Sequence, residues 1–168
     1  MLRMIVEAVA FDHRQQKVVL LKDLEGQKIL PIWIGPGEAR SIAIELEGAV
    51  SPRPLSHDLL LNVLRKRRAH VMRVVINDLM DDTFYATIEL DTPDGVKLID
   101  SRPSDAIALA VRAKCPIFAT GNALNALVDI EDILAPGETL PAEPEPPLPP
   151  DADDEIGRFR RLVGDLDI

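Results

Sequence analysis

Residues 83–90, TFYATIEL, alternate between apolar and polar side chains along their whole length. The apolar positions are Phe84, Ala86, Ile88 and Leu90. Because side chains of a β-strand point to opposite faces in turn, these four share one face and the polar ones share the other. The pattern predicts a half-exposed antiparallel strand. A strand of this kind needs partners, so the question is where the chain supplies them.

Short apolar runs separated by turn signals supply the neighbouring strands. Residues 70–79 precede this segment across MDDT, and residues 95–100 follow it across TPDG, so the three predict a meander. Residues 17–22 and 28–34 predict a hairpin around a glycine turn. The other predicted strands are residues 3–11 and a short one within CPIFAT, residues 115–120.

Three segments predict helices. Residues 37–47 follow Gly-Pro-Gly and end at Gly48, and residues 55–67 carry leucines and valine at helical spacing. Residues 103–113 predict the third helix, in which the apolar run Ala106–Val111 has no polar break. An unbroken run is typical of a buried helix. Residues 122–128 predict one or two further helical turns.

The composition bounds the domain organisation. The 168 residues suit one domain, predicted over residues 1–134. Residues 135–152 are rich in proline and acids, which predicts an extended or disordered linker. Residues 153–168 predict a short amphipathic helix. Residues 135–168 carry nine acids and three bases, a net charge of −6, so the predicted domain contributes only −3 of the total −9.

Charge, cysteine content and hydropathy exclude several classes. A net charge of −9 argues against a general nucleic-acid binder, although Arg65–Arg68 form a local basic cluster. With Cys115 as the single cysteine, no intramolecular disulfide can form, which fits the cytoplasm. No apolar run is long enough for a membrane span, and the N-terminus predicts a strand rather than a signal peptide.

Two predicted helices begin with similar residues. The segments SPRPLSHDLLLNVL and DSRPSDAIALAV each carry Arg-Pro, then serine and aspartate, then an apolar run. The residues are Arg53, Pro54, Ser56, His57 and Asp58 in one segment, and Arg102, Pro103, Ser104 and Asp105 in the other. Proline, a hydroxyl and an acid in the first turn suit the unpaired N–H groups and the dipole of a helix.

Helix capping accounts for the serines and acids better than for the arginines. A cation is unfavourable at the positive end of a helix dipole, so each arginine is expected to face a carboxylate or a phosphate. For Arg102 the candidates are Asp58, Asp105 and a substrate phosphate. If the two helix starts converge, then Arg53, His57, Asp58, Arg102 and Asp105 form one polar site.

Four blocks of the chain resemble the bifunctional nuclease family. They are LPIWIGPGEARSIAIELEG, RPLSHDLLLNVL, VVINDLMDDTFYATIEL and DSRPSDAIALAVRAKCPIF, in that order and spacing. One departure is the serine before His57, where the family more often has threonine; it keeps the hydroxyl. The resemblance implies an α+β fold, with a curved, largely antiparallel sheet packed by helices in a single domain. It also implies a homodimer and a nuclease that hydrolyses phosphodiester bonds in RNA or DNA.

A nuclease site needs an activated water and positive charge at the phosphate. The candidate catalytic residues are His57, Asp58 and Asp105, with His57 as acid or base. The candidate substrate-binding residues are Arg53, Arg102 and Ser104. The candidate ligands of a divalent metal, Mg or Mn, are Glu38, Asp58 and Asp105. The expected substrate is RNA or single-stranded DNA.

Each assignment has a structural alternative. Glu38 can simply complement a helix dipole, His57 can be a structural hydrogen-bonding residue, and Asp81–Asp82 suits a turn. Trp33 is predicted to be a core or interface residue, and Cys115 an inert buried thiol. The alternative function is a non-enzymatic dimeric binding or regulatory module. One open pocket shared by the site residues favours catalysis, whereas arginines buried against aspartates favour the module.

Overall fold

The structure, a computed structural model, describes residues 1–12 and 14–130. Its strands are β1 (Leu2–Phe11), β2 (Lys17–Asp23), β3 (Lys28–Trp33), β4 (His70–Met80), β5 (Thr83–Thr92), β6 (Gly95–Ser101), β7 (Ile117–Ala119) and β8 (Val128–Asp129). Its helices are α1 (Pro36–Leu46), α2 (Ser56–Lys66), α3 (Pro103–Ala113) and the 3₁₀ helix η1 (Gly121–Ala126). The predicted domain end at residue 134, the linker 135–152 and the helix 153–168 lie outside the described residues.

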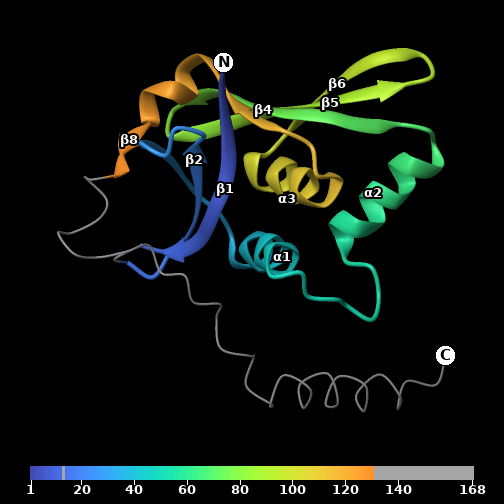
Figure 1. The fold of residues 1–168 in the computed structure, drawn as a ribbon, viewed down its shortest axis with the longest axis horizontal. Coiled ribbons are helices and arrows are strands. Elements are labelled where there is room, and N and C mark those ends of the chain that lie inside the picture. Colours follow the sequence, from blue (N-terminus) through green and yellow to red (C-terminus); the bar gives the residue numbers. More distant parts are fainter. Residues whose placement is uncertain (13, 131–168) are drawn as a thin grey trace.

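The strands form one open sheet in the order β6-β5-β4-β7-β1-β2-β3-β8. Neighbours are antiparallel except β4 and β7, which pair in parallel. Bulges interrupt the register of β1 once and of β4 twice, and such irregularities increase the local twist of a sheet. The helices pack against the sheet, so the chain has the α+β fold of a single domain (Figure 1).

Strand β5 is half-exposed, as its alternating sequence predicted. Ala86, Ile88 and Leu90 are buried, whereas Thr83 and Tyr85 on the other face are exposed. The buried face belongs to a core that combines side chains of β4 and β5 with those of α3. The predicted meander of β4, β5 and β6 is confirmed by the antiparallel registers on both sides of β5.

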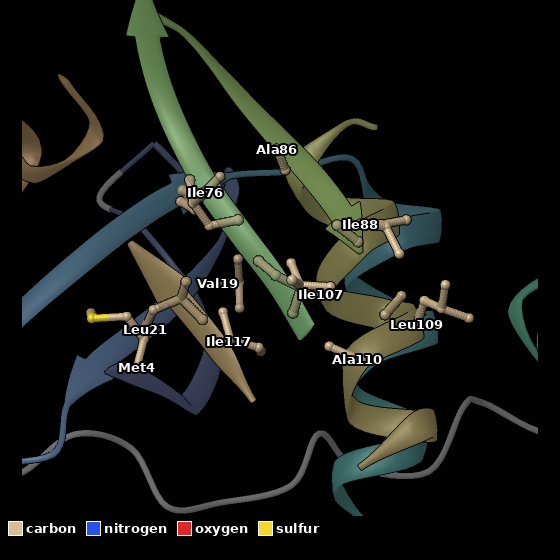
Figure 2. Packing of buried hydrophobic residues seen from close by; sticks show 14 of the residues in the cluster. Met4, Val19, Leu21, Ile76, Ala86, Ile88, Ile107, Leu109, Ala110 and Ile117 are labelled. Carbon is tan, nitrogen blue, oxygen red and sulfur yellow. The ribbon is translucent and has the colours of Figure 1, made fainter. Parts of the chain in front are cut away.

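Helix α3 lies at the centre of the domain, which explains its unbroken apolar run. It contacts β4 and β5 on the sheet side and α1 and α2 on the other side. Ile107, Leu109 and Ala110 are almost inaccessible to solvent, and Figure 2 shows them beside the side chains of the sheet. Because the helix has neighbours all round, little of its surface needs polar residues until its ends.

The start of α1 is fixed by local chemistry. Gly35 is its N-cap and Pro36 its first residue, where the ring presets the helical φ and the missing N–H is no loss. The carboxylate of Glu38 folds back over Gly35, and a Cβ at that position would collide with it. This arrangement places Glu38 beside the end of β3.

Candidate functional site

Arg102 connects two acidic side chains at the start of α3. It is the N-cap of the helix, and Pro103 is the first helical residue. Its Nε donates to Oδ2 of Asp105 at 2.7 Å, and its Nη2 donates to Oδ1 of the same carboxylate at 3.2 Å. Its Nη1 lies 3.0 Å from Oε1 of Glu38 on α1. The anion that Arg102 faces is therefore Asp105, joined by Glu38, and not Asp58.

His57 joins this cluster from α2. Its Nε2 lies 3.2 Å from Oδ1 of Asp105, and its Nδ1 lies 2.9 Å from Oγ of Ser41 on α1. An ionised carboxylate only accepts hydrogen bonds, so Nε2 carries the proton and donates to Asp105. In the neutral ring Nδ1 then accepts from the Ser41 hydroxyl. One continuous chain of contacts therefore crosses the three helices. It runs from Ser41 through His57, Asp105 and Arg102 to Glu38.

These contacts set the protonation states of the ion pair. Burial alone would raise the pKa of Asp105, but the hydrogen bonds from Arg102 and His57 and their charges outweigh it and hold the pKa below its usual value. The hydrogen bond to Asp105, with the nearby charges of Asp105 and Glu38, raises the pKa of Arg102. Asp105 is therefore ionised at neutral pH and cannot donate a proton.

Asp58 has a different partner from the one expected. Its Oδ1 accepts from Nε of Arg112 at 2.6 Å, and its Oδ2 accepts from the backbone N–H of Leu55 at 2.8 Å. Arg112 is buried and also donates to the carbonyl oxygens of Ala108 and Ser41. Burial would raise the pKa of Asp58, but the Arg112 hydrogen bond, the Leu55 amide and nearby positive charge lower it below its usual value. Asp58 therefore caps α2 and ties it to α3.

A pocket of about 280 Å³ adjoins the Arg102 cluster. Its walls are the end of β3, the start of α1, the β4–β5 turn and the start of α3. The lining includes Glu38, Arg102 and Ser104, whereas His57, Asp58 and Asp105 are not part of it. The pocket therefore lies between the N-terminal ends of α1 and α3, where backbone N–H groups and helix dipoles favour an anion.

The predicted site residues divide into three groups. Arg102 and Ser104 lie at the pocket, and Glu38 joins them there. His57 and Asp105 stand behind Arg102, whereas Asp58 is engaged by Arg112. Arg53 is exposed, and within the described part of the chain no hydrogen bond or ion pair connects it to the other site residues.

Two other sequence-based interpretations need correction. Ser104 is not a helix cap: it is buried, follows Pro103, and makes no capping hydrogen bond at the start of α3. Trp33 is not a core residue, because 54% of it is exposed at the rim of the pocket, where its Nε1 donates to Oδ2 of Asp12 at 3.0 Å. The turn role of Asp81 and Asp82 is confirmed by their positive φ angles of 48° and 58°.

The three predicted metal ligands do not fit one divalent ion in this arrangement. The guanidinium of Arg102 lies between Glu38 and Asp105, where a cation bridging the two carboxylates would lie. Both oxygens of Asp58 already accept hydrogen bonds elsewhere. Across residues 1–12 and 14–130, no three His, Cys, Asp or Glu side chains gather in the manner of metal ligands.

Sequence reasoning missed Ser41 and Arg112, although helical spacing carries a signal for both. Ser41 follows Glu38 by three residues on α1, so the two share a face. Arg112 follows Asp105 by seven residues on α3, which is about two turns. A polar residue repeated at that interval within an apolar helix marks the face that meets other polar groups.

Two further features were predicted from the sequence. Burial raises the pKa of the Cys115 thiol to about 11, which agrees with an unreactive side chain. Among the helices of the described residues, none combines the length and the apolar character needed to cross a bilayer.

The sequence of this chain is similar to a protein family and to two relatives. A model described as the bifunctional nuclease domain matches residues 19–128. Two uncharacterized proteins of Mycobacterium tuberculosis, one from strain CDC 1551 / Oshkosh and one from strain H37Rv, are each 41% identical to the chain over 105 residues. The matched region covers 62% of this chain and 62% of each relative, less than two thirds of the relatives' length.

Proposed function

The chain belongs to the bifunctional nuclease domain family, and we propose that it hydrolyses phosphodiester bonds in RNA or single-stranded DNA at the pocket between α1 and α3. The observation that carries this proposal is that Arg102 is exposed to the pocket and has N–H groups without a partner among the described residues. Its side chain is 67% exposed and lines the pocket, although three of its N–H groups already donate to carboxylates. An arginine has five such groups, so one on each terminal nitrogen is left for a phosphate.

The carboxylates orient Arg102 for that role. Asp105 binds the guanidinium through two nitrogens, and His57, which is itself held by Ser41, in turn holds Asp105. A guanidinium fixed in this way presents its remaining donors without losing further side-chain freedom on binding. His57 and Asp105 are therefore positioning residues in this proposal, in place of the direct catalytic roles first expected of them.

Glu38 activates the attacking water in this proposal. It lines the pocket, its Oε1 accepts from Arg102, and its side chain is 23% exposed. In the proposed reaction a Glu38 oxygen takes a proton from water, the water oxygen attacks phosphorus, and the ester P–O bond breaks. The leaving oxygen takes its proton from solvent. Arg102 and the two helix starts stabilise the negative charge that develops on the phosphate.

The alternative, a non-enzymatic binding module with arginines in structural bridges, describes part of the molecule. The Arg112–Asp58 pair is such a bridge, since the Arg112 side chain is only 3% exposed. Arg102 differs, because it is accessible from the pocket. Binding of single-stranded RNA without any cleavage would favour the module.

A cleavage assay tests the proposal. Wild-type protein is incubated with end-labelled single-stranded RNA, single-stranded DNA and duplex DNA, each in Mg²⁺, in Mn²⁺ and in EDTA, which also tests the predicted metal requirement. We expect cleavage of a single-stranded substrate. Replacing the general base in Glu38→Gln should slow cleavage by about a hundredfold or more, and Asp105→Ala and His57→Ala should slow it through the misplaced Arg102.

The matched control is Arg40→Ala, which removes an exposed arginine of α1 that does not line the pocket. Its cleavage rate should equal that of the wild type. If Glu38→Gln, Asp105→Ala and His57→Ala, prepared in the same way, all cleave as fast as the wild type, the activity does not come from this pocket and the proposal is wrong.

We also propose that the chain forms a homodimer through β6. This strand is at the edge of the sheet, and Val96, Leu98 and Ile99 are exposed along it. An exposed apolar edge strand presents unpaired N–H and C=O groups to any second strand, and folded proteins usually cover such an edge. A second copy related by a two-fold axis can pair with it in the antiparallel sense.

A further inference from the structure

Trp33 supports an inference about the ligand of the pocket. It is the last residue of β3 and contributes to the pocket lining, yet 54% of it is exposed. A large aromatic ring left in solvent contributes little to folding, because its apolar surface remains hydrated. Trp33 lines the same pocket as Arg102, which points to a role in binding.

The contact with Asp12 uses the edge of the Trp33 ring and not its faces. The indole Nε1, at the end of β3, donates to Oδ2 of Asp12, which lies in the connection between β1 and β2. A hydrogen bond from Nε1 lies in the plane of the ring, so it fixes the edge of the indole without using its faces. An anchored aromatic ring loses little freedom when a flat ligand stacks on it, which favours binding.

We propose that Trp33 is the stacking platform for one unpaired nucleobase of the substrate, whose phosphate lies on Arg102. The pocket lining holds both side chains, together with the second aromatic ring of Phe84. A volume of about 280 Å³ is at the small end of ligand pockets and suits a single nucleotide. Every nucleotide of a strand carries one base and one phosphate, the two parts that these side chains would contact.

This geometry selects single strands over duplexes. A base inside a duplex has neighbours on both faces, so it cannot stack on Trp33 unless it first leaves the helix, which costs a few kcal/mol. In a single strand the same contact is available at once, and it tolerates any sequence because every base has a π face. The site therefore takes unpaired RNA or DNA with little base preference.

The inference rests on the proposed function but is tested by binding alone. Trp33 is the single tryptophan of the chain, so its fluorescence reports on the pocket without a label. Full-length wild-type protein is titrated with adenosine 5′-monophosphate and, separately, with ribose 5-phosphate, which has the phosphate but no base. We expect saturable quenching with the nucleotide and none with the sugar phosphate. Equal responses to both would overturn the stacking role.

Two substitutions separate stacking from simple bulk. The affinity of each variant protein for a 2′-O-methyl phosphorothioate tetranucleotide, which resists cleavage, is measured by calorimetry. Trp33→Leu removes the aromatic face and should weaken binding about tenfold, whereas Trp33→Phe keeps a ring and should stay closer to the wild type. Wild-type affinity in Trp33→Leu, or equal affinity of the wild type for the same four nucleotides paired in the stem of a stable hairpin, would overturn the inference. The fluorescence result does not depend on the folding of either variant.

The two proposals fail in different ways. A Trp33→Leu protein that binds and cleaves like the wild type contradicts the stacking role and leaves the nuclease proposal intact. A wild-type protein whose fluorescence is quenched by the nucleotide, but which leaves cleavable RNA whole, contradicts hydrolysis and leaves the stacking role intact.

Discussion

Two arginines of this domain pair with aspartates, and one of them is buried whereas the other is exposed. Arg112 is buried and bonded to Asp58 and to two backbone carbonyls, so each of its three nitrogens donates within the fold and solvent hardly reaches it. Arg102 has a carboxylate partner too, but it is largely exposed and adjoins a pocket. The sequence indicated an arginine in need of an anion at each helix start. Only the structure shows that Arg112, unnoticed in the sequence, takes the aspartate of α2.

The Asp58–Arg112 pair predicts a large stability effect. Asp58→Asn leaves a buried guanidinium without its counter-charge, which costs up to 3–5 kcal/mol for a fully buried pair. Because the Asp58 side chain is 32% exposed, solvent screens part of this, and we expect a loss of about 3 kcal/mol in the free energy of unfolding. Urea denaturation at pH 7 measures it.

The pH dependence of that loss follows from the lowered pKa of Asp58. Burial opposes ionisation, but the contacts with Arg112 and Leu55 outweigh it, so the folded pKa is below the unfolded one. The stabilisation is then complete above the unfolded value of about 3.9 and disappears as the pH falls through the folded value. The difference between wild type and Asp58→Asn should shrink below about pH 4. A constant difference down to pH 2 would contradict the pairing.

At the scale of elements, the sequence predicted the helices and most strands to within a few residues. The predicted segments 103–113 and 83–90 correspond to α3 and β5, because an unbroken apolar run and a strict alternation are strong local signals. The two-residue strand β8 was missed, since so short a segment has no period. Similar sequences at the starts of α2 and α3 suggested that these two flank a site. The pocket instead lies between the starts of α1 and α3.

The edge strand β6 carries a prediction about assembly. Leu98→Lys places a charge on the exposed face of the edge and should shift the protein from dimer to monomer in sedimentation equilibrium at micromolar concentration. The fold should tolerate the change, because the cross-strand partner of Leu98 is Glu89, whose carboxylate pairs with Arg73 through one oxygen and can also attract the new lysine.

The matched control is Leu24→Lys, which charges an exposed leucine in the turn after β2. It should leave the dimer intact. A wild-type protein that sediments as a monomer, or a Leu98→Lys protein that dimerises like the control, would contradict an interface at β6.

At the scale of the whole molecule, the fold class was predictable and the site only in part. The resemblance and the strand patterns gave an α+β domain with a mostly antiparallel sheet, as found. The grouping of Glu38, His57 and Arg102 depends on how α1, α2 and α3 pack together, which no local pattern encodes. Trp33 was predicted to be a core or interface residue, and the core alternative was wrong for the same reason: the strand that it ends lies beside an open pocket.

The proposed function depends on the binding of the cleaved phosphate by Arg102. It is tested most directly by kcat/KM for single-stranded RNA in wild type, Arg102→Ala, Arg102→Lys and Arg40→Ala, with thermal melting to confirm that each is folded. We expect Arg40→Ala to match the wild type and Arg102→Ala to fall by about a hundredfold or more, since a charge-stabilising donor is lost. Arg102→Lys keeps the charge without the planar fork and should lie between them. An Arg102→Ala protein that cleaves as fast as Arg40→Ala would contradict the account.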